Sequence, residues 1–204
     1  MLNEIYDISK PLPESIEYNG VKYLLKLYFN RVLMFFDLFN KDSILNDSDK
    51  YEIGFEWFTE NEGSLLSAFE KEEFVNLIIQ KYVIISRRSD NGSKKIVDFA
   101  QDSAYIYASF MSDYNIDLLN EHDKLHWWKF RALFDGLSEN SIIKRIMQIR
   151  AAEIPVLNQH NYKEIEHLTQ QKLYYALEIS QEEKEKNVAS GWAKLFAIME
   201  QRAN

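Results

Sequence analysis

Apolar side chains recur along the chain at spacings that predict helices, with one exception near the start. Residues 16–23 alternate apolar and polar positions around Asn19-Gly20, a dipeptide that suits a tight β-turn, so we expect a small β-hairpin there. Residues 28–39 place apolar side chains three and four positions apart, which puts them on one face of a helix. The residues of this predicted stripe are Phe29, Val32, Leu33, Phe36 and Phe39.

Two further helices are predicted at 49–59 and 70–85. The second one ends in the run Val83-Ile84-Ile85, whose β-branched side chains allow a short strand as an alternative ending. Residues 89–93 contain Asp-Asn-Gly and indicate a turn.

A longer helical seam begins at Asp98, where apolar residues follow one another at alternating steps of four and three. We predict that this face is buried and that the opposite face points away from the core. The buried face consists of Ala100, Ala104, Tyr107, Met111 and Tyr114, widened by Phe99, Ile106 and Phe110. The opposite face consists of Asp98, Gln101, Asp102, Tyr105 and Ser109.

Residues 121–135 carry apolar side chains in nearly every direction around a helix, which is typical of a central, enclosed helix. Gly136 is the predicted C-cap, and Ser138 or Asn140 is expected to begin the next helix. That helix carries Ile142, Ile143, Ile146 and Ile149 and is followed by Pro155. Another helical region beyond Asn161 carries Ile165 and Leu168.

The end of the chain changes character. Residues 180–187 are polar and charged and predict a hinge. An amphipathic helix follows, with apolar residues at steps of four, three and four, and it packs either on its own chain or in a groove of a partner protein. Its stripe is Val188, Trp192, Leu195 and Met199. We therefore expect a mostly α fold: a single helical domain with an N-terminal hairpin over residues 1–179, and an extension over 180–204.

Composition narrows the classes of function. The chain of 204 residues suits one core, and the absence of cysteine excludes disulfides and thiolate metal sites. The N-terminus lacks the pattern of a signal peptide, and no apolar run is long enough to cross a bilayer. A net charge of −8 opposes binding to nucleic acid. We expect a soluble cytoplasmic protein that binds neither nucleic acid nor membrane.

The charge is unevenly distributed along the sequence. Residues 37–73 hold eleven acids against three lysines, whereas residues 124–150 hold six basic residues against two acids. A solvated surface is the simpler interpretation. The alternative is that the two regions attract each other, within one molecule or between copies in a homo-oligomer.

Three groups of residues raise the question of chemistry. His122 and His126 are spaced to share one helical face and a metal ion, but Asp123 replaces the glutamate of metalloproteases and no third ligand is indicated. Asp98 and Asp102 lie one helical turn apart, and pairing with Lys129 or Arg131 is favoured over acid–base catalysis. Trp127-Trp128 suits core packing better than base stacking, because adjacent helical side chains point about 100° apart.

The sequence also lacks two common catalytic or nucleotide-binding motifs, because it has no glycine-rich phosphate loop and no nucleophile elbow. We therefore expect no catalysis, no cofactor and no bound metal. A metal-dependent hydrolase that uses His122 and His126 stays the remote alternative.

Two segments of the chain resemble a phage protein family named for the fifteenth gene product of a temperate siphophage. The first segment runs from Asp98 to Phe110, and the second runs from Leu125 to Leu133 and includes Gly136-Leu137. The resemblance covers residues 14–177 and is strongest over 96–150. Within it, the residues expected to serve as core or interaction residues are Asp98, Asp102, Tyr105, Tyr107, His126, Trp127, Trp128, Lys129, Phe130 and Arg131.

This resemblance implies a role in building a long non-contractile phage tail, because the family is encoded in the tail module near the tape-measure gene. A chaperone or adaptor that binds the tape-measure protein or other tail proteins is the expected function. A structural component of the virion tail is the alternative. The extension over 180–204 departs from the family's shorter ending, so the resemblance assigns it no role.

Overall fold

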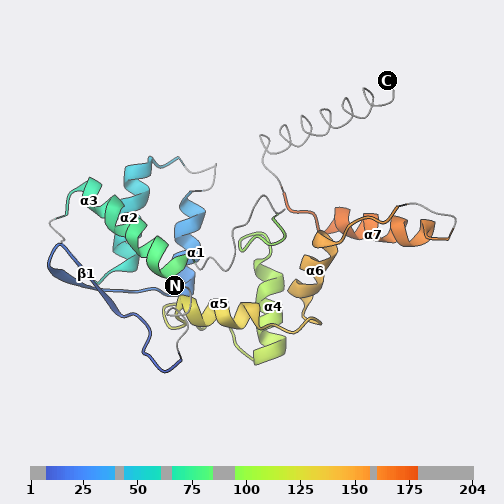
Figure 1. Cartoon of the computed structure of the whole chain (residues 1–204), viewed down its shortest axis with the longest axis horizontal. Helices are drawn as coiled ribbons and strands as arrows, with labels where there is room; N and C mark the ends of the chain where they lie inside the picture. The colour runs from blue at the N-terminus through green and yellow to red at the C-terminus, as the bar shows by residue number, and fades with distance from the viewer. Residues whose placement is uncertain (1–7, 40–43, 61–65, 85–94, 157–159, 179–204) are drawn as a thin grey trace, which may run out of the picture. The chain divides into compact units, whose positions relative to one another are not determined.

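A computed structural model of the chain describes residues 8–39, 44–60, 66–84, 95–156 and 160–178. It contains two compact units, residues 1–148 and 149–204. The described residues form seven α-helices, one π-helical turn and one two-stranded sheet (Figure 1). This confirms the mostly α fold with a small N-terminal hairpin. The turn predicted at 89–93 and the extension predicted at 180–204 lie outside the described residues, so the boundary after residue 179 stays a prediction.

The hairpin consists of β1 (Ser15–Tyr18) and β2 (Val21–Leu24), which pair antiparallel with Tyr18 opposite Val21. Asn19 and Gly20 both have left-handed backbones, with φ of 50° and 75°. A two-residue hairpin turn of this kind requires positive φ at both positions, which Asn and Gly adopt most easily. The Asn-Gly prediction is therefore confirmed.

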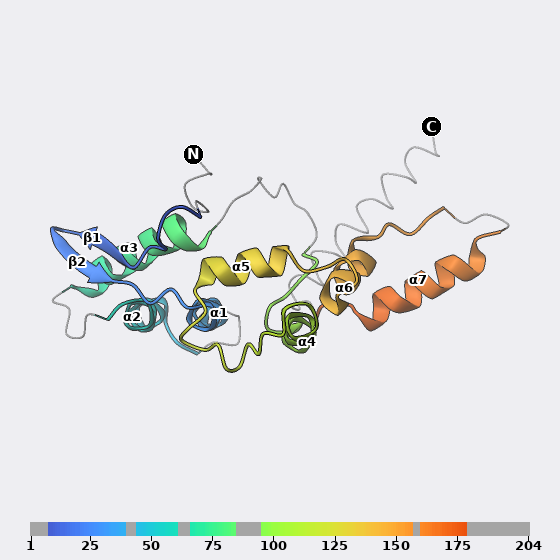
Figure 2. The same ribbon diagram turned by 90° about the horizontal axis from the view of Figure 1, so that it is seen from below.

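Three helices pack together beside the hairpin: α1 (Phe29–Leu38), α2 (Asp47–Phe58) and α3 (Ala68–Ile78) (Figure 2). The Asn46 side chain caps α2, and Ser67 begins α3 with a reciprocal capping box. Aromatic rings fill the space between these elements, and Phe74 of α3 contacts rings of both strands and of α2. The rings of this group are Tyr18, Tyr23, Phe55 and Phe74.

The buried face of α1 differs from the predicted stripe. Phe35 is buried together with Phe29 and Val32, whereas Phe36 is 42% and Phe39 is 39% exposed. Gly54 of α2 explains the difference, because a Cβ atom there would overlap the ring of Phe35. The close approach that Gly54 permits turns Phe35 toward α2 and leaves Phe36 and Phe39 at the surface.

The helix α3 does not end in the short strand that Val83-Ile84-Ile85 allowed as an alternative. The helix continues into a π-helical turn, η1 (Ile79–Val83), which is closed by a hydrogen bond from the Ile84 N–H to the Ile79 carbonyl at 2.8 Å. Val83 is therefore helical, and the backbone becomes extended only at Ile84.

The helix that follows Asp98, α4 (Ser103–Tyr114), buries only part of the predicted face. Ile106 and Phe110 are buried as predicted, whereas Ala100 and Ala104 are exposed. Asp102 and Ser109, predicted on the opposite face, are buried, because the prediction treated every polar side chain as facing solvent. Both polar residues make hydrogen bonds that shape the neighbouring chain.

The next two helices, α5 (Trp127–Asp135) and α6 (Ile142–Ala151), begin later than predicted. Gly136 is the C-cap of α5, as expected. Residues 138–141 form a turn rather than the first residues of α6, and the Ile143 N–H is satisfied by the Ser109 hydroxyl at 3.1 Å. Ile143 and Ile146 of α6 are buried, whereas Ile142 is exposed.

In the second unit, α7 (Tyr162–Tyr174) confirms the helix predicted beyond Asn161, but none of its residues is buried. Two charged side chains hold it instead. The Lys172 ammonium donates to the carbonyls of Ile149, Arg150 and Ala152 at 2.6 to 2.9 Å. The Arg150 guanidinium in turn donates to the Tyr175 carbonyl at 2.6 Å. Each helix thus supplies a cation that caps the C-terminal end of the other.

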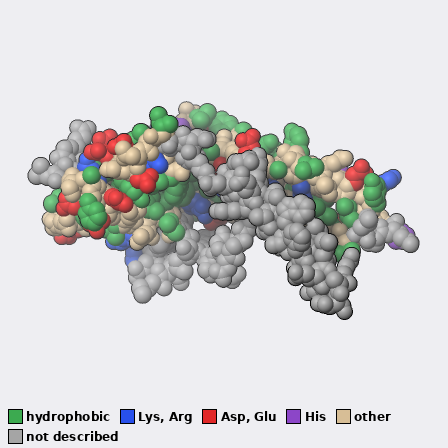
Figure 3. Space-filling model, turned by 90° about the horizontal axis from the view of Figure 1, so that it is seen from above, with side chains coloured by type: hydrophobic (Ala, Val, Ile, Leu, Met, Phe, Trp, Pro, Cys, Tyr) green, Lys and Arg blue, Asp and Glu red, His purple; other side chains and the backbone are tan. Residues whose placement is uncertain are grey.

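Acidic side chains gather at the end of the first unit that holds the hairpin, α2 and α3 (Figure 3). Two lysines of this region are largely covered: Lys50 of α2 pairs with Asp47 and lies over the Phe39 ring, and Lys71 of α3 pairs with Glu52. None of the helices in the described ranges is long and apolar enough to cross a membrane.

Candidate functional site

The segment before α5 forms turns over residues 118–124 and then pairs with residues 27–29, which explains why this helix does not begin at residue 121. Residues 125–127 lie along residues 27–29, with the Phe29 N–H donating to the Leu125 carbonyl at 3.0 Å and the Trp127 N–H donating to the Leu27 carbonyl at 2.7 Å. Asp123, in a left-handed conformation, accepts a hydrogen bond from Arg31 at 2.6 Å. These contacts fix the backbone until His126.

His126 is the N-cap of α5. Its Nδ1 atom accepts a hydrogen bond from the Trp128 N–H at 3.1 Å, so the proton of the neutral ring resides on Nε2. Nε2 is buried and meets no hydrogen-bond partner among the described residues. Burial, together with the nearby charge of Lys129, lowers the pKa of His126 to about 4.

The histidine pair does not have the helical geometry that a shared metal ion would need. His122 lies outside α5, and the left-handed backbone of Asp123 separates the two histidines. The His122 ring packs edge-on against Phe29, with ring centroids 5.7 Å apart. Within the described residues, no three His, Cys, Asp or Glu side chains are grouped to hold a metal ion.

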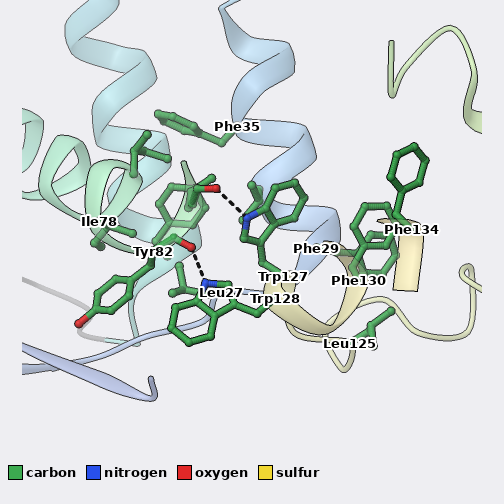
Figure 4. Packing of buried hydrophobic residues seen from close by; sticks show 14 of the residues in the cluster. Leu27, Phe29, Phe35, Ile78, Tyr82, Leu125, Trp127, Trp128, Phe130 and Phe134 are labelled. Atoms are coloured by element: carbon green, nitrogen blue, oxygen red, sulfur yellow. Dashed lines mark hydrogen bonds between the residues drawn. The ribbon is translucent and has the colours of Figure 1, made fainter. Parts of the chain in front are cut away.

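The two adjacent tryptophans satisfy the end of the π-helical turn. The Trp127 indole N–H donates to the Val83 carbonyl at 3.1 Å, and the Trp128 indole N–H donates to the Tyr82 carbonyl at 2.6 Å (Figure 4). Carbonyls at the end of a helix lack partners within the helix, and these two are buried against α5. Because the indoles point about 100° apart, one reaches each of two successive carbonyls.

Phe130 fills the centre of the first unit and is 1% exposed. Its ring stacks on Phe29 of α1 at a centroid distance of 4.9 Å and on Phe110 of α4 at 5.3 Å. We call the buried contacts that Trp127, Trp128 and Phe130 make the α5 joint. The joint connects α5 to α1, to η1 and to α4.

The cationic residues of the same segment lie at its edge. The Arg131 guanidinium lies over the rings of Trp127 and Phe99 at 5.7 and 5.9 Å, and 4.0 Å from the Asp135 carboxylate. Lys129 is exposed. Arg131 therefore covers the aromatic cluster, and Lys129 is directed to solvent.

Asp98 and Asp102 shape the turn that leads into α4. Asp98 pairs with Lys95 at 2.6 Å, in place of the predicted Lys129 or Arg131, and its other oxygen accepts the N–H groups of Ala100 and Gln101. Burial opposes ionisation of Asp98, but these hydrogen bonds outweigh it and lower its pKa. Asp102 is 1% exposed and accepts the Asp98 N–H at 3.0 Å.

The two predicted tyrosines of α4 have separate roles. Tyr105 offers its backbone carbonyl to the Ser109 hydroxyl at 2.7 Å. Burial and a hydrogen bond with the Asp117 carboxylate raise the pKa of Tyr107. The Asp117 carboxylate also accepts the Leu119 N–H at 3.0 Å, so Tyr107 contacts the turn that follows α4.

The family model described as Bacteriophage Gp15 protein matches residues 8–177. The chain belongs to this family. Comparisons with curated proteins and with solved structures gave no match. The matched range includes the whole α5 joint and both motif segments, so the contacts described above are contacts among residues of the Gp15 family match.

In this Gp15-family chain, the aromatic side chains Trp127, Trp128 and Phe130 of the motif join α5 to other helices, whereas Asp98 and His126 make local contacts. Three residues that contribute hydrogen bonds between elements were not among the predicted site residues: Ser109, Arg31 and Tyr114, whose hydroxyl donates to the Leu133 carbonyl at 2.9 Å. Arg31 also donates to the Trp57 carbonyl at 2.9 Å. Apart from the Tyr105 carbonyl that Ser109 also contacts, their partners lie between 19 and 92 residues away in the sequence, so no local pattern reveals them.

Proposed function

We propose that this protein acts without catalysis in phage or prophage tail assembly, as a chaperone or adaptor that binds the tape-measure protein. Membership of the Bacteriophage Gp15 family carries the assignment to a phage. The tape-measure partner rests on the resemblance of the two motif segments to a family encoded in the tail module.

The geometry of the motif supports a binding role. The side chains that could take part in chemistry are engaged in capping and packing: His126 caps α5, Asp98 caps a turn, and both indole N–H groups bind carbonyls. Because these motif side chains stabilise the fold, a partner protein would bind the outer surface of the helices.

Aromatic side chains on α1 provide one such surface. Phe36 and Phe39 lie three residues apart on the same side of the helix and are both about two-fifths exposed. The Phe39 ring continues this surface to Tyr51 of α2, with ring centroids 5.4 Å apart. A tape-measure protein is long and helical, and an amphipathic helix recognises exposed apolar surface of this kind.

Co-expression with a tape-measure protein from the same phage or prophage tests the proposal. We expect affinity capture to recover a soluble complex that is absent when this protein is omitted. Phe36→Ser should weaken capture about tenfold, equivalent to about 1.4 kcal/mol, without changing the melting temperature. Phe69→Ser is the matched control, because Phe69 is an exposed phenylalanine on α3.

Two results would contradict the proposal. One is failure of the unmodified protein to bind a tape-measure protein that is independently shown to be soluble and folded. The other is equal weakening by Phe36→Ser and Phe69→Ser, which would remove the role of the α1 surface. Recovery of the protein in stoichiometric amounts from purified particles would favour a structural tail component instead.

A further inference from the structure

The outer side of α3 combines exposed apolar side chains with a carboxylate. Phe69, Glu73 and Leu77 follow one another at steps of four, which places them along one side of the helix. Phe69 is 66% and Leu77 is 37% exposed, and Glu73 between them is also exposed. This side of α3 therefore presents an acid with an apolar residue about one turn away in each direction.

The β-hairpin widens this apolar surface. The Tyr18 ring packs edge-on against Phe74 of α3, with ring centroids 5.1 Å apart, and the Tyr18 hydroxyl donates to the Glu73 carboxylate at 3.4 Å. Val21 is the cross-strand partner of Tyr18, so it lies on the same face of the hairpin, and it is 49% exposed. We call Val21, Phe69, Glu73 and Leu77 the α3 surface.

The charge around the α3 surface is negative. The elements β1, β2, α2 and α3 contain eight acids against three lysines. Two of these lysines, Lys50 and Lys71, are paired with acids of α2. A protein that covers the α3 surface therefore needs cations beside its apolar side chains.

The opposite combination lies on α6 of the same chain. Ile143 and Ile146 are buried, which fixes the side of α6 that faces inward. Ile142 is 40% exposed, and Arg145, three residues later, is also exposed. Residues 127–148, which include α5 and most of α6, contain four basic side chains against two acids. We call Ile142 and Arg145 the α6 surface.

We propose that the α6 surface of one copy of this protein binds the α3 surface of a second copy. Arg145 then faces Glu73, and Ile142 packs among the apolar residues of the α3 surface. Opposite charges and apolar side chains meet in the same arrangement, which is the complementarity that fixes register between protein surfaces. Within one chain, α4 and α5 lie between α3 and α6, so the contact joins two copies (Figures 1 and 2).

The proposed contact joins different surfaces of the two copies, so it is heterologous. A dimer formed in this way still has one unoccupied α3 surface and one unoccupied α6 surface. Further copies therefore add head to tail until the assembly closes into a ring or continues as a filament. The α1 surface proposed to bind the tape-measure protein takes no part, so self-association and tape-measure binding can fail independently.

Sedimentation velocity of the full chain tests the proposal. We expect species larger than a dimer as the protein concentration rises, and dissociation as salt is added, because salt screens exposed charges. Glu73→Lys and Arg145→Glu should each weaken self-association at least about tenfold, because each places like charges opposite each other. Glu153→Lys is the control, because it makes the same charge change at an exposed position outside both surfaces.

A charge exchange distinguishes a lost contact from a damaged fold. The double variant with Glu73→Lys and Arg145→Glu in one chain restores opposite charges across the contact, and we expect it to recover self-association. Circular dichroism of each variant shows whether its helices are retained. Failure of the double variant to associate, with its helices retained, would overturn the pairing of these two residues.

A mixture of two variants tests the head-to-tail geometry. Glu73→Lys retains a native α6 surface, and Arg145→Ser retains a native α3 surface. An equimolar mixture should therefore form a dimer and nothing larger, although each variant alone is monomeric. Absence of the mixed dimer would overturn the proposal, as would an unmodified protein that stays monomeric or stops at a dimer. Equal loss of association in Glu153→Lys and Glu73→Lys would also overturn it, because net charge would then explain the effect.

Discussion

Two helices of this protein, α5 and α7, are held in place by opposite means. The nine residues of α5 include four buried aromatic side chains, which contact three other elements. The thirteen residues of α7 include no buried side chain, and two cations bound to carbonyls hold its position. A helix can therefore be placed by burial or by polar capping within one chain.

The two means differ in strength and in reach. Burying an aromatic side chain removes a large apolar area from water and contributes a few kcal/mol, and the loss is felt by every helix in contact with the ring. A capping bond at a partly exposed site competes with water and contributes about 1 kcal/mol. We expect damage to the α5 joint to unfold the first unit, and damage to the caps of α7 to stay local.

The largest effect is expected for Phe130→Ala. The substitution leaves a cavity between Phe29 and Phe110, and loss of a fully buried phenylalanine costs about 3–5 kcal/mol. Denaturant unfolding followed by circular dichroism measures this loss. A change below about 1 kcal/mol would show that the ring is not at the centre of the unit.

The second-largest effect is expected from acidification, which lowers the free energy of unfolding through His126, the N-cap of α5. His126 has a pKa of about 4 in the folded protein, below its ordinary value of 6.5. The unfolded chain therefore takes up a proton first, so the free energy of unfolding falls as the pH decreases from 6.5 to 4. The loss is at most about 3 kcal/mol and is smaller in practice because the ring is partly exposed.

His126→Asn isolates this contribution, because asparagine keeps an N-cap acceptor but does not titrate. Unfolding curves at pH 7 and pH 4.5 should show a smaller difference for the variant than for the unmodified protein. The carboxylates with lowered pKa, such as Asp98 and Asp123, affect both proteins equally. Identical pH dependence in the two proteins would show that His126 titrates normally.

A smaller effect is expected for Trp128→Phe, which keeps an aromatic ring but removes the indole N–H. The buried Tyr82 carbonyl then loses its donor, at a cost of about 1–2 kcal/mol. Trp57→Phe is the control, because this tryptophan is only partly buried and lies outside the α5 joint. Equal stability of the two variants would argue that water reaches the carbonyl.

The smallest effect on global stability is expected for Lys172→Met. Water can replace the ammonium at the three carbonyls, so the loss is about 1 kcal/mol and confined to α7. Amide exchange should rise across residues 162–175, while the unfolding midpoint of the first unit stays constant. Lys163→Met, at an exposed position, should change neither quantity. A lower midpoint for the first unit would contradict the contrast between the two helices.

Local patterns in the sequence predict most helices and the hairpin, because they depend on residues close together in the chain. Which side of α1 faces the core cannot be predicted in this way. Phe35 and Phe36 are equally apolar, and only Gly54, on another helix, decides that Phe35 points inward. The start of α5 is likewise set at a distance, by the pairing of residues 125–127 with residues 27–29.

The motif residues show the same limit. Their aromatic character predicts burial of Trp127, Trp128 and Phe130, which the structure confirms. The inward position of Asp102 and Ser109 could not be predicted, because a polar residue is buried only where particular backbone groups need it. Those groups are the Asp98 N–H and the Ile143 N–H.

The paired indole hydrogen bonds limit changes of chain length near α5. Two donors on adjacent residues bind two successive carbonyls, so they fix both the rotation of the helix and its position along its axis. Deleting one residue between Leu125 and Trp127 would move Lys129 to the place of Trp128 and bring its ammonium into a buried aromatic site. The number of residues in this short stretch is therefore as constrained as their identity. Variants with one residue inserted or deleted there should fail to fold.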